Sequence, residues 1–493
     1  MQAWWSGRSA VLAGALCVCF GASRCVSDAD GDGARQALQA HRIDGMTVSE
    51  FNPPPAESSN ITLVGQQSFG GRGNFGDVWV HGDYAYIGGY RDPHCPGDPV
   101  NIADVSNPTR PTAVASFAGH AHTSAEDVEV FEVNSAAFQG TVAAVGLQDC
   151  SETRGVYGMR GLELWDTTNP RRPTRLGFLS TSDLPEGGVH ELNAFTRGGR
   201  YYVAVASNFF AVEGTDSPGP VRIIDVTNPR APTLVSGWHI GRDAGLAYGS
   251  PLFSNRPPYN CSAPRGGTSD CRMATSGGYP VVTPHSVSVN GTATRLYVSY
   301  WDAGMVILDI RDMAHPRMIG RGNSTAAEEG DMHSSLEVPY FGGNIALTTD
   351  EDFSPVFNLE SVPSDIWGYV RVWDLSNPAV PRQIAAITSP HSASARTDGF
   401  YAVHNPVAWR NLAFFSWYTD GVRVYDLATP SSPQLLGFFD APRVPPPESM
   451  RGGLPVGAIW GVYVRPPYIY ASDMNAGLYV LQMNGAIMSH ARP

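Results

Sequence analysis

Short runs of β-branched and aromatic residues recur along most of the chain, separated by turns rich in glycine, asparagine and proline. In one stretch the pattern predicts four successive strands, at residues 190–195, 201–206, 221–225 and 233–237. No segment shows the apolar spacing of a long amphipathic helix. The pattern therefore favours an all-β protein built from many short strands.

A turn motif repeats along this pattern and divides it into units. In each copy a strand ends in Asp and leads into a turn that contains proline, with a further proline soon after. The six copies begin at Asp104, Asp166, Asp225, Asp309, Asp374 and Asp426. A unit of this size cannot bury its own apolar face, so such units stack on copies of themselves.

The first strands of the units imply that there are seven of them. They begin near Asp77, Glu126, His190, His285, His333, His404 and Trp460. The seventh unit stops after its third strand, and residues 61–69 resemble the missing fourth one. An N-terminal strand that completes the last sheet closes a ring without an open edge. We therefore predict a seven-bladed β-propeller over residues 61–485, followed by a tail at 486–493.

The third strands and their turns, such as residues 221–226, 304–310 and 421–427, resemble the LVIVD-repeat family of exported bacterial β-propeller proteins. The resemblance extends over nearly all of residues 61–483. It implies a propeller architecture and export. Because that family has no single established activity, the resemblance implies no particular reaction.

The N-terminal residues predict export as well. An apolar run at residues 10–22 follows a short segment with one positive charge, as in a secretory signal, and is short for a membrane span. We assign residues 1–25 to a signal peptide and 26–60 to a flexible polar linker. The mature chain would be extracytoplasmic, in the periplasm, at the cell surface or secreted, without a transmembrane segment. A lipid anchor is a weaker alternative, because no small residue precedes Cys17, Cys19 or Cys25.

Four cysteines remain after the leader, an even number in an oxidising compartment. Cys261 and Cys271 would close a small loop within one insertion. Cys95 and Cys150 occupy corresponding loops of neighbouring units. Two disulfides are therefore predicted.

Composition excludes several classes of function. The net charge of −13 argues against a nucleic-acid partner, which needs a basic face. All 33 basic residues are arginine, so a lysine Schiff base and a pyridoxal cofactor are excluded. No phosphate-cradling glycine loop or nucleophile elbow is present. We expect a monomer that engages a protein or a small polar ligand.

The loops of such a propeller emerge on two different faces. The Asp-containing turns between third and fourth strands are short and uniform, which favours a structural role. The long segments all fall on the other face, here named the insertion face: residues 119–125, 181–189, 209–219, 242–284, 351–368, 387–403 and 440–458. Insertions confined to one side of a repeat scaffold usually build its binding surface.

Acidic residues that follow the second strands are candidates for binding on the insertion face. They are Asp302, Asp350, Glu351, Asp420 and Asp473. Their oxygens are suited to a cation or a polar ligand. The alternative is structural, because aspartate also initiates turns.

Four consecutive units place histidine at the start of the innermost strand, at His190, His285, His333 and His404. Imidazoles that converge on a central channel are suited to a transition metal ion, with Glu126 as a carboxylate ligand. The alternative is that each ring bonds a nearby loop and closes the channel mouth. The sequence assigns no catalytic residue.

Two functions fit these features. The first is an exported cell-envelope propeller that serves as an interaction platform through its insertion face. The second is a metal-dependent enzyme, oxidase-like or hydrolase-like, that uses the channel histidines. In general plan the chain is also similar to the selenium-binding and methanethiol oxidase propellers, which carry channel histidines.

Overall fold

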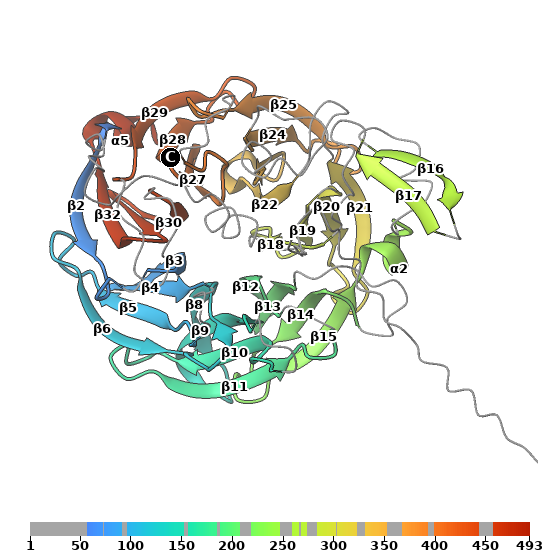
Figure 1. Cartoon of the computed structure of the whole chain (residues 1–493), viewed down its shortest axis with the longest axis horizontal. Helices are drawn as coiled ribbons and strands as arrows, with labels where there is room; N and C mark the ends of the chain where they lie inside the picture. The colour runs from blue at the N-terminus through green and yellow to red at the C-terminus, as the bar shows by residue number, and fades with distance from the viewer. Residues whose placement is uncertain are drawn as a thin grey trace, which may run out of the picture.

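Strands wrap around a central axis in the computed structural model, as Figure 1 shows. The structure describes the following residues: 57–71, 73–90, 96–151, 156–184, 188–207, 218–246, 259–265, 268–273, 283–301, 303–322, 331–352, 367–392, 399–442 and 457–493. The predicted signal peptide and nearly all of the predicted linker lie outside these residues.

Each blade is an antiparallel sheet whose strands follow one another from the axis to the rim. Blade 1 contains β3 (Phe75–His81), β4 (Tyr84–Gly89), β5 (Val100–Asp104) and β6 (Thr112–Phe117). Blade 2 contains β8 (Val128–Asn134), β9 (Gln139–Asp149), β10 (Gly161–Asp166) and β11 (Thr174–Ser180), with the short β7 (Thr123–Ser124) beside β9. Blade 3 contains β12 (Glu191–Arg197), β13 (Arg200–Ala206), β14 (Val221–Asp225) and β15 (Thr233–Trp238).

The remaining blades repeat this order. Blade 4 contains β18 (Ser286–Val289), β19 (Arg295–Tyr300), β20 (Gly304–Asp309) and β21 (Arg317–Gly322). Blade 5 contains β22 (Met332–Glu337), β23 (Ile345–Asp350), β24 (Val370–Asp374) and β25 (Arg382–Ile387). Blade 6 contains β26 (Pro406–Trp409), β27 (Leu412–Trp417), β28 (Gly421–Asp426) and β29 (Gln434–Phe439). Blade 7 contains β30 (Ile459–Arg465), β31 (Tyr468–Asp473), β32 (Gly477–Met483) and β2 (Ile61–Gln67).

The N-terminal strand β2 closes the ring by pairing with β32. Its register runs from Ile61 opposite Met483 to Gln67 opposite Leu478. In Figure 1 the blue β2 lies beside the red β32. The prediction of an all-β, seven-bladed propeller closed by an N-terminal strand is therefore confirmed. A further short strand, β1 (Ser58–Ser59), pairs with β29 of blade 6 within the segment that we assigned to the linker.

The repeated Asp turns hold their own backbone, as their structural interpretation requires. In blade 1, Asp104 Oδ1 accepts the Ser106 N–H at 3.1 Å, and Asn107 Oδ1 accepts the Thr109 N–H at 3.2 Å. The same pair of bonds recurs in blade 5, at Asp374 and Asn377. These side chains fix the turn by local hydrogen bonds.

Apolar side chains fill the interfaces between neighbouring blades rather than one common core. Each of seven clusters joins two adjacent sheets. Between blades 3 and 4, for example, Ile223 packs in one cluster with Val298 and Leu308. Each such buried side chain contributes about 1.5–3 kcal/mol of hydrophobic stabilisation. The stack of interfaces thereby fixes the position of every inner strand around the axis.

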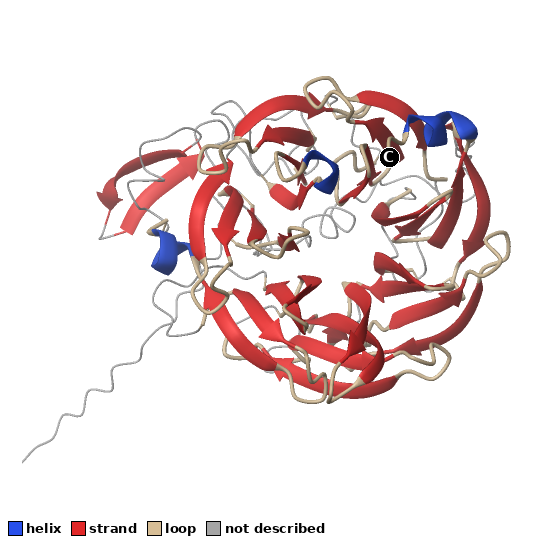
Figure 2. Ribbon diagram, turned by 180° about the vertical axis from the view of Figure 1, so that it is seen from behind, coloured by secondary structure: helices blue, strands red, loops and turns tan. Residues whose placement is uncertain are grey.

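A few further elements lie between or after the blade strands. The helix α2 (Ile240–Ala244) and the paired strands β16 (Tyr259–Arg265) and β17 (Thr268–Met273) follow blade 3, and the hairpin projects outward in Figure 1. The 3₁₀ turn η2 (Pro339–Phe341) joins β22 to β23, and α5 (Gly485–His490) follows β32. Figure 2 shows the same ring from behind, with its few helical segments. Among the described residues, no helix has the length and apolar character needed to span a membrane.

Candidate functional site

The predicted histidines come together near the axis from four consecutive blades. His190 and His285 immediately precede β12 and β18, His333 lies in β22, and His404 lies two residues before β26. Each side chain is at most 1 % exposed. The innermost strands of the propeller therefore bring together residues that are far apart in sequence.

A local irregularity of β22 sets the position of His333. The register shifts between Met332, which is opposite Asp350, and Ser334, which is opposite Thr349. His333 is thus the extra residue of a bulge, and bulges redirect side chains next to functional sites. The equivalent irregularity in β30 involves Trp460, between Ile459 and Gly461.

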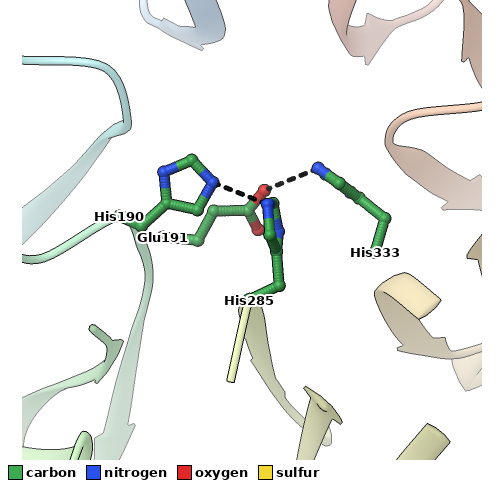
Figure 3. Close-up of side chains that lie close together, drawn as sticks. All are labelled: His190, Glu191, His285 and His333. Carbon is green, nitrogen blue, oxygen red and sulfur yellow. Dashed lines mark hydrogen bonds and ion pairs between the residues drawn. The ribbon is translucent and has the colours of Figure 1, made fainter. Parts of the chain in front are cut away.

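The imidazole rings form a continuous contact series. The ring centroids are 4.2 Å apart for His190 and His285, 4.0 Å for His285 and His333, and 3.9 Å for His333 and His404. The Nε2 atoms of His190 and His285 are 2.9 Å apart. Figure 3 shows His190, His285 and His333 converging, with Glu191 between them.

Two glutamates complete this cluster. Glu191 Oε1 lies 3.9 Å from His333 Nε2, and Glu351 Oε2 lies 3.7 Å from the same nitrogen. The phenol of Tyr418 donates a hydrogen bond to the other oxygen of Glu351. The sequence interpretation placed Glu351 on the binding face and did not include Glu191 in the site. Its position directly after His190 was the available signal.

Several of these buried atoms lack a hydrogen-bond partner in the described part of the chain. They are His285 Nδ1, His333 Nε2, both ring nitrogens of His404, Glu191 Oε1 and Glu351 Oε2. Buried polar atoms are nearly always paired in folded proteins, so each exception calls for an explanation. A ligand that accepts nitrogen and oxygen lone pairs would provide one.

Burial also sets the protonation of the cluster. It lowers the pKa of His285, His333 and His404 well below the usual value, and neighbouring imidazoles lower each further. Burial raises the pKa of Glu191 well above its usual range, with repulsion from nearby carboxylates, and raises the pKa of Glu351 to about 8. Neutral imidazoles carry the lone pair that a metal ion requires.

The spacing of the donor atoms suits a metal ion. One ligand atom from each of His190, Glu191, His285 and His333 lies within 4.8 Å of the others, and the same holds for His333, Glu351 and His404. Donors at 2.0–2.1 Å around a tetrahedral ion stand roughly 3.4 Å apart. The 2.9 Å and 3.9 Å separations described above lie on either side of that value.

Glu126 lies behind the histidines rather than among the donor atoms. Its Oε2 is 2.8 Å from His190 Nδ1, and its Oε1 accepts the indole N–H of Trp460 at 2.9 Å. His190 Nδ1 also lies 2.9 Å from Gln148 Nε2, so both side chains hold the ring from behind while its Nε2 faces His285. Carboxylates that hold a ligating histidine in this way set its tautomer and orientation.

The other acidic residues predicted to bind a ligand on the insertion face contact protein groups outside the histidine cluster. Asp350 pairs with the buried Arg371, with Oδ2 2.6 Å from Nη2. Asp420 Oδ1 is 2.6 Å from His391 Nδ1. Asp473 accepts backbone N–H groups of Ala458, Asn475 and Ala476, as a turn residue does. Asp302 lies outside the described residues.

The predicted disulfides are described only in part. Cys150 is disulfide-bonded, while Cys95 lies outside the described residues, so their pairing stays a prediction. Cys261 and Cys271 are opposite each other in the backbone register of β16 and β17, which brings their chain positions together.

An aromatic cluster adjoins the histidines on the insertion face. It comprises Tyr90, Trp367, Phe400, Tyr401, Tyr418 and Trp460, packed with Ala402, Ala458 and Met474. They lie in the segments between second and third strands, in the segments before first strands or, for Trp460, at the start of β30, which places them at the insertion-face edge of the sheets. Ring centroids of His404 are 4.3 Å from Trp460 and 5.4 Å from Tyr418.

Comparisons with known proteins agree with this architecture. The family model described as the LVIVD repeat matches residues 72–118 and 285–324, which correspond to blades 1 and 4. No curated protein matches the chain.

Several solved structures are similar to the chain. They include the computationally designed Ika8 protein (TM-score 0.44, 11% identity, 85% of this chain and 99% of that one). Raptor of Chaetomium thermophilum gives a TM-score of 0.49 at 10% identity, over 86% of this chain and 29% of that one. The β-propeller domain of Cps50 (Swd1) from Myceliophteria thermophila gives 0.45 at 10% identity, over 84% and 97%. The strand pairing and the matched repeats establish that the chain is a seven-bladed β-propeller that carries LVIVD repeats.

Proposed function

We propose that this protein is an extracytoplasmic metal-binding propeller, with one transition metal ion held near the axis by His190, His285, His333 and Glu191. The observation that carries the proposal is that one ligand atom from each of these four buried residues lies within 4.8 Å of the others. His285 Nδ1, His333 Nε2 and Glu191 Oε1 also lack a hydrogen-bond partner among the described residues. Burial without a partner costs free energy for each polar atom, and coordination of an ion offsets that cost.

The donor set indicates the class of ion. Three imidazoles and one carboxylate suit zinc, copper, iron or nickel, whereas magnesium and calcium prefer oxygen ligands. His404 and Glu351 form a second group with His333, and Glu351 Oε2 lies 3.7 Å from the Nε2 atom of His333. The lone pair of His333 Nε2 can bind only one ion. His404 and Glu351 would therefore lie beside that ion rather than hold a second one. This second group offers a place for an exogenous ligand, as a metal-dependent oxidase or hydrolase requires.

Elemental analysis of purified protein tests the proposal. Protein supplied with zinc, copper, iron and nickel salts should retain about one ion per chain after dialysis, and His285→Ala and His333→Ala should each lose it. His315→Ala is the matched control, because His315 is 74% exposed and bonds Asp312 on an outer turn. A wild-type protein without retained metal would refute the proposal, and so would a folded His285→Ala variant that keeps the full complement.

The insertion face supports a second candidate function, an interaction platform at the cell envelope. The outward hairpin β16–β17 and the other insertions contrast with the uniform Asp turns of the opposite face. A photo-crosslinking residue in place of Asn260 should give discrete adducts in intact cells, whereas one in place of Ser376, on an Asp turn, should give none. The reverse pattern would assign partner binding to the opposite face.

A further inference from the structure

A ring of polar residues lies directly beyond the histidines, one position along the inner strands toward the Asp turns. Three of its members are carboxylates from three consecutive blades. Its polar members are Asp77, Asp127, Glu191, Ser286, Ser334 and Asn405, and Gly461 holds the equivalent position in blade 7. Glu129 lies two residues beyond Asp127 on β8. The metal site thus adjoins an acidic wall on the side away from the insertion face.

The hydrogen-bond donors to these carboxylates are neutral. Asn405 Nδ2 donates to both oxygens of Asp77, at 3.0 and 2.8 Å. The backbone N–H of Leu192 donates to Asp127 at 2.6 Å. Glu129 accepts the Asn193 amide at 2.9 Å and the Ala194 N–H at 2.6 Å. None of these donors brings a positive charge. Burial raises the pKa of Asp77 and of Glu129 to about 7 and that of Asp127 well above its usual range, so the wall gains its negative charge as the pH rises through neutrality.

Exposure increases from the histidines toward this wall. The four imidazoles are at most 1 % exposed, and Asp127, Glu129 and Glu191 are 6–7 % exposed. Asp77, Asn405, Asn193 and Ser288 are half-buried. Glu191 links the two regions, since it belongs to the polar ring and its unpartnered Oε1 faces His333.

The insertion-face side of the histidines is closed by contrast. Every member of the aromatic cluster is buried, and its rings contact both ends of the histidine series. Trp460 lies 4.3 Å from His404, and Tyr90 lies 6.1 Å from His190, between ring centroids. Trp460 and Tyr90 also contact each other, at 4.8 Å.

We propose that metal cations reach the histidine site from the face of the Asp turns, guided along the inner wall by Asp77, Asp127 and Glu129. This inference rests on the proposed metal binding and adds its route. Once ionised, the carboxylates raise the local concentration of cations, and Glu191 transfers the ion to the imidazoles by exchanging water for nitrogen ligands. The aromatic cluster separates the bound ion from the insertion face.

Kinetics of metal uptake by the full-length apoprotein test the route. Zinc uptake at pH 8, followed by competition with a chromogenic chelator, should be about tenfold slower in Asp77→Asn/Glu129→Gln at low ionic strength. The difference should shrink in high salt, because salt screens the attraction. The final stoichiometry should stay at about one ion, since the donor residues are intact. Each single variant should show part of the effect, which guards against misfolding of the double variant.

A matched control removes the same charge elsewhere. Asp166→Asn/Asp374→Asn changes two outer turns, where asparagine can still accept the backbone N–H, and should load at the wild-type rate. Phe400→Ala, which opens the aromatic cluster, should leave uptake unchanged. Equal rates in the inner-wall and outer-turn variants, or faster uptake in Phe400→Ala, would overturn the route. A wild-type protein that takes up no zinc, copper, iron or nickel would instead remove the metal site itself.

Discussion

Individual side chains at the axis show how far residue-level prediction reaches. The recurrence of histidine at equivalent strand positions predicted the convergence of His190, His285, His333 and His404, because a closed ring directs equivalent positions to one axis. The approach of Glu191 to the histidines depends on the direction of its side chain at the start of β12. The spacing of the repeats does not reveal that direction. The placement of Glu126 behind His190 depends on Trp460, from another blade. Such contacts come from the tertiary arrangement alone.

Asp350, a candidate for ligand binding in the sequence, forms a buried ion pair with Arg371 in the structure. Asp350 and Arg371 are 1 % and 0 % exposed, and Arg371 also donates to Gln383 and lies over the Tyr369 ring. We expect Asp350→Asn to lower the free energy of unfolding by about 3–5 kcal/mol, because it removes the negative charge that pairs with a buried guanidinium. Denaturant unfolding would measure this loss.

The exposed pair of Arg382 and Asp374 provides the comparison for that measurement. Asp374→Asn keeps the turn acceptor and should shift the unfolding midpoint far less. A similar midpoint for Asp350→Asn and the wild type would show that the buried pair contributes little.

Strands and turns were the most predictable level of this molecule. The Asp motif marks the end of each third strand and the period fixes the number of units, so blade order followed from the sequence. One contact between neighbouring blades could not be predicted from the sequence. A Cβ at Gly320 in β21 would lie 1.8 Å from the carbonyl oxygen of Pro378, in the turn of the next blade. The repeated proline turn therefore packs against the neighbouring blade, a contact that a single unit does not reveal.

Closure by β2 predicts a sharp effect of truncation. A chain that begins at residue 68 lacks β1 and β2, so the edge of β32 loses its partner and unpaired N–H and C=O groups become available. We expect a lower unfolding midpoint and self-association, measured by thermal unfolding and size-exclusion chromatography. A chain that begins at residue 57 is the control and should keep both strands. Equal behaviour of the two chains would argue against a closing role for β2.

The whole molecule combines apolar interfaces between blades with carboxylates and imidazoles near the axis. These groups titrate in opposite senses. The pKa of Glu129 is raised to about 7 by burial, so its contribution to stability is complete below pH 4.5 and is lost as the pH rises through 7. The buried histidines have lowered pKa values, so they reduce stability as the pH falls below 6.5.

A comparison of Glu129→Gln with the wild type isolates the carboxyl contribution. At pH 5 the variant should be less stable by about 1 kcal/mol, because the amide satisfies only one of the two donors. At pH 8 the wild type must ionise a buried carboxyl group, and the difference should move in favour of the variant by on the order of 2–3 kcal/mol. Urea unfolding at both pH values, with a chelator present, measures the change. A difference that is independent of pH would refute it.

Each donor of the proposed metal site comes from a different blade, apart from the adjacent His190 and Glu191. The circumference of the disc, and hence the number of repeats, would therefore set the size of the proposed coordination sphere. Loss or duplication of a single repeat would alter all the distances between imidazoles at once, with no change at the ligands themselves. Selection for binding of the ion would in that way conserve the number of blades, which folding alone would allow to change.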